Sequence, residues 1–276
     1  MGAAVVLGLL SGLSWGVADF LGGVASRRAA ALAVVALSQA AGLAVALVAL
    51  AIIRPDVPSA THIAYGLAAG LVGVIGLMAF YRALATGSMS VIAPISALGA
   101  LVPVTVDLLG GDAPATVVLT GMILALCGAA LVARAPGPAS RSGVGLALIA
   151  ALGFGGFFSF LSLAADGESA LWALITARAA SVPFALATAV VVGASFALAR
   201  PVLLMVAIGG ILDASANLMF AAGSQRGLTS VVAVLGSLYP VTTVALASVI
   251  LKERLGPLQA AGAGFALVGV GMIAAG

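Results

Sequence analysis

Charged side chains are scarce in this sequence. Only 7% of its 276 residues are Asp, Glu, Lys or Arg, whereas 63% are hydrophobic. A water-soluble domain of this size needs more polar surface than that, so the composition excludes one. Apolar windows of about 20 residues recur along the whole chain, and each is long enough to cross a bilayer core of roughly 30 Å as a helix. The composition therefore predicts an all-α, multi-pass membrane protein.

Cysteine and histidine are each present only once. Cys127 alone excludes a disulfide framework and a Cys-based metal site, and its apolar surroundings favour a small buried side chain. His62 is expected in a loop. Since no HExxH, GxSxG or phosphate-loop motif stands out, we expect neither an enzyme nor an ATP-driven pump, and neither a metal nor a cofactor. Most basic residues fall beside helix ends, which argues against a nucleic-acid partner.

Apolar runs bounded by Gly, Pro and charge divide the chain into ten expected helices. They fall at residues 3–25, 30–53, 63–84, 90–109, 115–133, 143–164, 169–193, 201–224, 229–250 and 257–275. The polar stretch ARAPGPASRSG at 133–143 lies near the midpoint of the chain. It predicts a junction between a first five-helix half, residues 1–137, and a second, residues 138–276.

The two halves resemble each other in three places. LSWG at 13–16 matches LGFG at 152–155, ALVPV at 100–104 matches SLYPV at 237–241, and the segment 111–128 matches 252–269. Because each half has an odd number of helices, the second enters the membrane from the opposite side. This predicts two inverted repeats around a central cavity, the architecture of alternating access.

The pattern as a whole resembles the EamA family of the drug/metabolite transporter superfamily. It consists of five plus five helices, an aromatic-Gly pair in the first helix of each half, a proline-containing fourth helix and the loop LKERLGPLQ. The strongest pieces are LSWGVADF at 13–20 and the segment 235–272, whereas GGDAPA weakens the first-half counterpart of the loop. The resemblance implies a bundle in which helices 1, 3, 4, 6, 8 and 9 surround the cavity, with a small organic solute as cargo.

Asp213 lies near the middle of the eighth expected helix, in ILDASANLMF. An ionised Asp at that depth costs about 2.5–3.5 kcal/mol, so it must face a partner or water. Asn217 and Ser224 fall on the same helical face, which we expect to line the cavity. Two roles stay open for Asp213. It either accepts a proton or binds a substrate ammonium group, or it forms a structural ion pair with Arg178 of the preceding helix.

Further candidates for substrate binding come from the first helix and from two tyrosines. Asp19 follows Trp15 by four residues, which makes a polar-aromatic stripe suited to an amphipathic solute. Asp19 is also the second candidate for proton coupling. Alternatively, it lies near water and pairs with Arg27 or Arg28. Tyr81 and Tyr239 are expected at the cavity rim, although ordinary packing would also explain them.

Prolines and glycines predict the sites of motion and of close packing. Pro94 and Pro103 in the fourth helix and Pro240 in the ninth remove backbone hydrogen bonds, and we expect hinges there, although kinks also occur in static bundles. Gly121, Gly128, Gly262 and Gly269 put a small-residue face on the fifth and tenth helices. This face could serve the core or a dimer contact, so we expect a monomer or a homodimer.

The expected function is secondary transport of a small organic metabolite, such as an amino acid, an amine or a similar amphipathic solute. The expected place is the inner (plasma) membrane and the expected direction is export. A lipid flippase or scramblase and a non-transporting membrane scaffold stay open as alternatives. Loops on one side carry eight basic residues and those on the other carry two. The positive-inside rule then places both termini outside, whereas the resemblance implies both inside.

Overall fold

The computed structural model describes residues 2–86, 89–112, 114–132, 143–250 and 256–275. Within them every regular element is a helix, and no strand is present. The elements are, in chain order, α1 (Gly2–Ser26), α2 (Ala31–Ile53), α3 (Ala60–Thr86), α4 (Met89–Ala97), the 3-10 helix η1 (Leu98–Ala100), α5 (Leu101–Gly110), α6 (Thr116–Val132), α7 (Val144–Ala165), α8 (Ala170–Val191), α9 (Arg200–Ser224), α10 (Thr229–Gly236), α11 (Tyr239–Ile250) and α12 (Pro257–Ala275). His62, expected in a loop, lies in the first turn of α3.

Seven segments of the described chain are long and apolar enough to cross a membrane. Six are the single helices α1, α2, α3, α7, α8 and α9, and the seventh is the stretch Thr229–Leu246. Shorter apolar helices at Ile95–Gly110, Thr116–Leu131 and Gly264–Ile273 occupy the places of the other three expected helices. The chain is therefore a multi-pass membrane protein.

The fourth and ninth expected helices are not continuous, which corrects the sequence-based prediction. The fourth is divided into α4, η1 and α5, and the ninth into α10 and α11 around Ser237 and Leu238. Pro103 and Pro240 follow these breaks. A proline lacks the N–H that would bond to the carbonyl four residues earlier, and its ring clashes with that carbonyl. That residue is Gly99 in one case and Gly236 in the other. Around Pro94, by contrast, α4 continues without a break.

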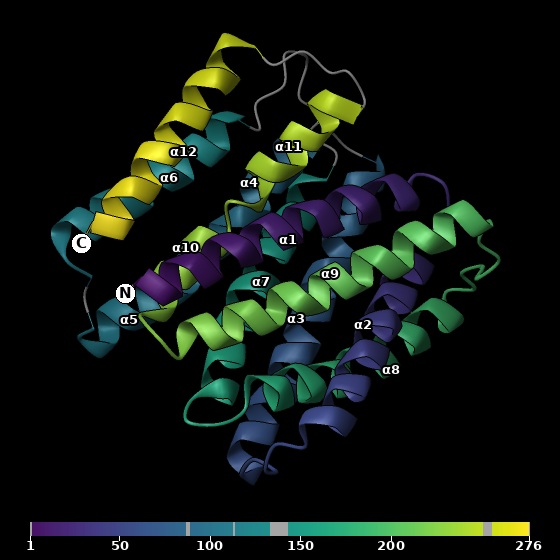
Figure 1. The fold of residues 1–276 in the computed structure, drawn as a ribbon. Helices are drawn as coiled ribbons and strands as arrows, with labels where there is room; N and C mark the ends of the chain where they lie inside the picture. The colour runs from purple at the N-terminus through teal and green to yellow at the C-terminus, as the bar shows by residue number, and fades with distance from the viewer. Residues whose placement is uncertain (1, 87–88, 113, 133–142, 251–255, 276) are drawn as a thin grey trace.

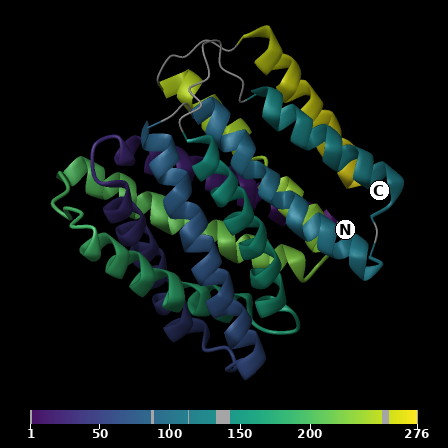
Figure 2. The same cartoon turned by 180° about the vertical axis from the view of Figure 1, so that it is seen from behind.

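Helices of the first half pack mainly against helices of the second half. In the first half α1 contacts α9, α10 and α11, and its counterpart α7 contacts α3 and the broken helix α4–η1–α5. The remaining helices form mixed pairs, because α2 contacts α8 and α6 contacts α12. The α6–α12 pair lies at one edge of the bundle (Figure 1), and the view from behind shows the same pair side by side (Figure 2).

Glycine allows the closest approaches at the broken helices. A Cβ atom on Gly12 of α1 would lie 2.7 Å from the Leu235 carbonyl oxygen and 3.0 Å from that of Gly236. In the other half, a Cβ atom on Gly99 would lie 2.5 Å from the carbonyl oxygen of Ala151. Gly12 and Ala151 are equivalent positions in the repeat predicted from the sequence, 139 residues apart. Each broken helix is therefore pressed against the first helix of the opposite half.

The small-residue face of α6 and α12 is used inside the chain. A Cβ atom on Gly128 would lie 2.4 Å from the backbone nitrogen of Ala266, and one on Gly269 would lie 2.6 Å from the carbonyl oxygen of Gly121. Cys127, expected to be buried, is exposed. The reason is that α12 covers mainly the glycine face of α6, so the neighbouring face lies at the edge of the bundle.

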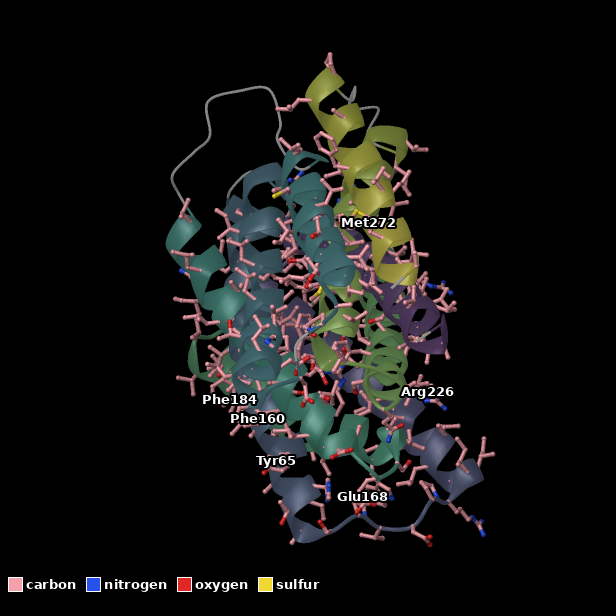
Figure 3. The ribbon with its side chains drawn as sticks, turned by 90° about the vertical axis from the view of Figure 1, so that its left-hand side faces the viewer. Tyr65, Phe160, Glu168, Phe184, Arg226 and Met272 are labelled. Atoms are coloured by element: carbon pink, nitrogen blue, oxygen red, sulfur yellow. The ribbon has the colours of Figure 1, made fainter. Side chains whose placement is uncertain are left out.

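Side chains tie three connections together at one end of the bundle. The backbone N–H of Ser59 donates to Glu168 Oε1 at 3.2 Å, and His62 Nδ1 lies 3.5 Å from the same oxygen. Gln225 Nε2 donates to the carbonyl oxygens of Ala165 and Glu168. Figure 3 shows Glu168 at the same end as Tyr65 of α3. These contacts join the α2–α3, α7–α8 and α9–α10 connections.

Candidate substrate-binding site

A cavity opens between the two halves of the bundle. It holds about 540 Å³ of empty space, with the open space at its mouth included. Its walls come from α1, α2, α3, α7, α8, α9 and α11. The polar lining residues are Asp19, Gln39, Arg178, Ser181, Asp213 and Asn217, and the aromatic ones are Trp15, Phe154, Phe157, Phe158 and Tyr239.

Arg178 of α8 and Asp213 of α9 form an ion pair in the cavity wall. The Arg178 side chain is 4% exposed and that of Asp213 is 18% exposed. Arg178 Nη2 donates to Asp213 Oδ2, and Nη1 donates to Oε1 of Gln39 on α2. The same Gln39 oxygen accepts a hydrogen bond of 2.8 Å from Ser181 Oγ. Each charge thus has an opposite charge beside it, which offsets the cost of placing it at membrane depth.

Asn217 extends this network to α1. Its Nδ2 lies 3.4 Å from Asp213 Oδ2, and its Oδ1 accepts a 3.0 Å hydrogen bond from Trp15 Nε1. The Trp15 ring packs against Phe158, with 5.4 Å between the ring centroids. Ser224, expected on the same face of the helix, donates to the carbonyl of Ala221 and does not line the cavity.

Asp19 lies in the same cavity but outside the ion pair. The residue is only 7% exposed. In the described residues no basic side chain lies within ion-pair distance of its carboxyl, and the exposed Arg27 and Arg28 are not its partners. The hydroxyl of Tyr81 on α3 lies near its carboxyl. That hydroxyl fits against Gly22, where a Cβ atom would lie 2.2 Å away.

The two tyrosines occupy different places. Tyr239 lines the cavity, and its hydroxyl donates to the carbonyl oxygen of Ala93 at 3.1 Å. Tyr81, expected at the rim, is buried and does not line the cavity. It packs behind Asp19, because Gly22 leaves room for its hydroxyl.

Several lining residues escaped the sequence analysis. Gln39 is a hydrogen-bonding hub, and the cost of a buried carboxamide in an apolar helix could have identified it by the argument applied to Asp213. Ser181 and the phenylalanines of α7 carry no such signal. Serine is ordinary in membrane helices, and Phe157 and Phe158 are as typical of packing as of a cavity wall.

The fold and the cavity define a helical, multi-pass membrane protein with a polar and aromatic central site. Residues 141–275 match the EamA-like transporter family. The second half of the chain thus carries the pattern of that family, one of the drug/metabolite transporter superfamily, as the sequence pattern suggested. A membrane transporter family implies a lipid bilayer and a small-molecule substrate.

A solved structure supports the fold independently. A chain described as "Crystal structure of protein" superposes with a TM-score of 0.77, covering 98% of this chain and 95% of its own length. The two sequences are 18% identical, so the likeness concerns the fold. No curated protein matches the chain.

Proposed function

We propose that the protein is a secondary transporter that moves a small organic solute through the central cavity by alternating access. The observation that carries this proposal is the cavity itself. It is built from helices of both halves and combines an ion pair, an additional carboxyl group and a set of aromatic rings. A site of this kind binds amphipathic solutes of small size.

The two halves, residues 1–137 and 138–276, are proposed to be inverted repeats. The exchange pattern of helix packing supports this, since α1 against α9 is matched by α7 against α3. The equivalent breaks ahead of Pro103 and Pro240 support it as well. With five membrane segments each, the halves have opposite directions, and exchanging their conformations would open the cavity to the other side.

The breaks in the fourth and ninth segments are the proposed hinges. A helix interrupted at Gly99 or Gly236 has fewer backbone hydrogen bonds to resist bending than a continuous one. Tyr239 follows the second break directly and lines the cavity. Movement at this break would therefore change the cavity wall. Pro94, inside the continuous α4, stays a weaker hinge candidate.

We assign solute contacts to Trp15, Asp19, Asp213, Asn217 and Tyr239. Proton coupling is proposed for Asp19 or Asp213, the two carboxyl groups that line the cavity. The dense bonding of Asp213 supports a structural contribution from that residue and leaves Asp19 freer to exchange a proton.

The proposed location is the inner (plasma) membrane, with export as the direction. The first turn of α1 and the last turn of α12 lie on the same side of the bundle (Figure 1). By the sequence count, eight basic residues fall in the loops expected opposite the termini, four of them outside the described residues. By the positive-inside rule, the side with the termini faces outward.

The test is transport by the purified protein in proteoliposomes, with amino acids and amphipathic amines as solutes. Wild type is compared with Asp213→Asn, and Asp166→Asn in an exposed turn is the matched control. Proton movement that depends on solute and vanishes only in Asp213→Asn identifies Asp213 as the coupling group. Solute movement without protons in all three proteins indicates a uniporter or exchanger. Failure to move any solute would refute the proposal, and lipid transfer between leaflets would indicate a flippase.

A further inference from the structure

We infer that the cavity selects an organic monocation with an aromatic or apolar body, and that the carboxylate of Asp19 is the counter-ion of its ammonium group. This inference rests on the proposed function, because it names the class of solute that the same cavity takes. It separates amines from amino acids, two classes that the sequence leaves equally open.

The ionisable groups that line the cavity do not balance in charge. The described lining residues include two carboxyl groups, Asp19 and Asp213, and one cationic group, Arg178. The charge of Arg178 is balanced by Asp213, and its two Nη atoms donate to Gln39 and Asp213, while its Nε is buried without a hydrogen-bond partner in the described part of the chain. When both carboxyl groups are ionised, the cavity holds one uncompensated negative charge. A single positive charge on the solute would balance it.

The uncompensated negative charge lies on Asp19 and not on Asp213. Asp213 Oδ2 interacts with Arg178, with Gln39 Nε2 at 3.4 Å and with Asn217 Nδ2 at 3.4 Å. Among the described residues Asp19 takes part in no ion pair, and its neighbours include the uncharged hydroxyl of Tyr81 and Asp213, a group of the same sign. An ionised carboxylate so placed lacks compensation at membrane depth. An ammonium group beside Asp19 would supply it.

Aromatic rings form part of the cavity wall. Trp15 and Phe158 lie with their ring centroids 5.4 Å apart, and Phe154, Phe157 and Tyr239 complete the aromatic lining. Ring faces attract cations and also accept the apolar body of a solute. Trp15 is one helical turn from Asp19 on the same helix, so one amphipathic amine can contact both.

The same charges disfavour a zwitterion. An amino acid brings a carboxylate in addition to its ammonium group, and Arg178 has no charge left to balance it. The extra group would be the third carboxylate in a partly buried cavity. Discrimination of this kind comes from an unpaired charge in the wrong ligand as much as from attraction to the right one.

The test compares three ligands that share a phenylethyl body. Binding of 2-phenylethylamine, phenylalanine and the uncharged 2-phenylethanol to the purified wild-type protein is measured by calorimetry. We expect the amine to bind at least about tenfold more tightly than either analogue, because each analogue loses the charge match. Equal or tighter binding of phenylalanine, or of the alcohol, overturns the inference without the need for any variant.

Variants then locate the charge. Asp19→Asn should weaken amine binding by about tenfold or more and leave 2-phenylethanol unchanged, Asp19→Glu should restore part of the amine affinity, and Asp166→Asn should behave as wild type. Unchanged amine binding in a folded Asp19→Asn protein overturns the assignment to Asp19. In proteoliposomes, transport of amino acids but not of amines would refute this inference while the proposed transporter function stands.

Discussion

The centre of the bundle and its α6–α12 edge are held together by different interactions. At the centre, side chains of α1, α2, α8 and α9 are joined by the ion pair of Arg178 and Asp213 and by the hydrogen bonds of Gln39 and Asn217. At the edge, α6 and α12 touch through glycines, with backbone against backbone.

This difference concerns two tasks, the binding of a solute and the packing of the helices. Close packing at glycines contributes van der Waals contact and has no group that distinguishes one solute from another. The central network costs desolvation of its charges, and its contribution to stability depends on every member staying paired. A costly polar centre beside an inexpensive apolar edge supports the proposed binding role of the centre.

The largest effect is expected from removing the central cation. Arg178→Met leaves Asp213 and Gln39 without their main donor, and the loss of one partner of a buried pair costs about 3–5 kcal/mol. Unfolding in detergent measures the change, with Arg200→Met at the exposed start of α9 as the control. The double variant Arg178→Met/Asp213→Leu should recover much of the loss. Equal stability of the two single variants would contradict the importance of the pair.

The next largest effect is expected at the edge. Gly128→Val places new atoms against the backbone of Ala266 and Gly262, and overpacking of this kind costs about 1–3 kcal/mol. Gly264→Val is the matched control, because nothing lies within 4 Å of a Cβ atom there. Thermal unfolding should separate the two variants, while solute affinity should stay the same in both. A loss of affinity in Gly128→Val would show that the edge and the cavity are coupled.

A smaller effect is expected from a single indole hydrogen bond. Trp15→Phe keeps a ring but removes the donor to Asn217, which costs about 1 kcal/mol. Trp172→Phe removes a comparable 3.2 Å bond to the carbonyl oxygen of Pro55, outside the cavity. The two variants should lose similar stability, and only Trp15→Phe should lose solute affinity, by a few-fold. Equal affinity in both would remove Trp15 from the site.

The smallest effect is expected at Cys127. Its side chain is exposed on α6, so Cys127→Ala should change the free energy of unfolding by no more than about 0.5 kcal/mol. The measurement is the same unfolding transition. A change as large as that of Gly128→Val would mean that more than the glycine face of α6 contributes to its packing.

The membrane-embedded helices and the polar candidates could be predicted because their signals are local. Apolar length alone identifies a spanning segment, and the cost of charge alone singles out Asp213 and Arg178 as residues that need partners. Arg178 and Asp213 are also close together in the sequence, since α8 and α9 are consecutive helices.

The rest depends on contacts between distant segments. Gln39 contacts Arg178 although the two are 139 residues apart in the sequence, and no local sequence pattern predicts this contact. Tyr81 was expected at the cavity rim but is buried behind Asp19, because Gly22, on another helix, leaves space for its hydroxyl. The prolines were visible in the sequence, but a complete break in the helix depends also on the glycine four residues earlier and on the helix pressed against it.

The positions of Arg178, Asp213 and Gln39 along the chain also bear on membrane insertion. During synthesis α8 precedes α9, so Arg178 is made 35 residues before its acidic partner. Gln39 of α2 is made earlier than both, and its carboxamide oxygen accepts a hydrogen bond from Arg178 in the folded chain. We expect this carboxamide to be the partner of the guanidinium until α9 joins the bundle.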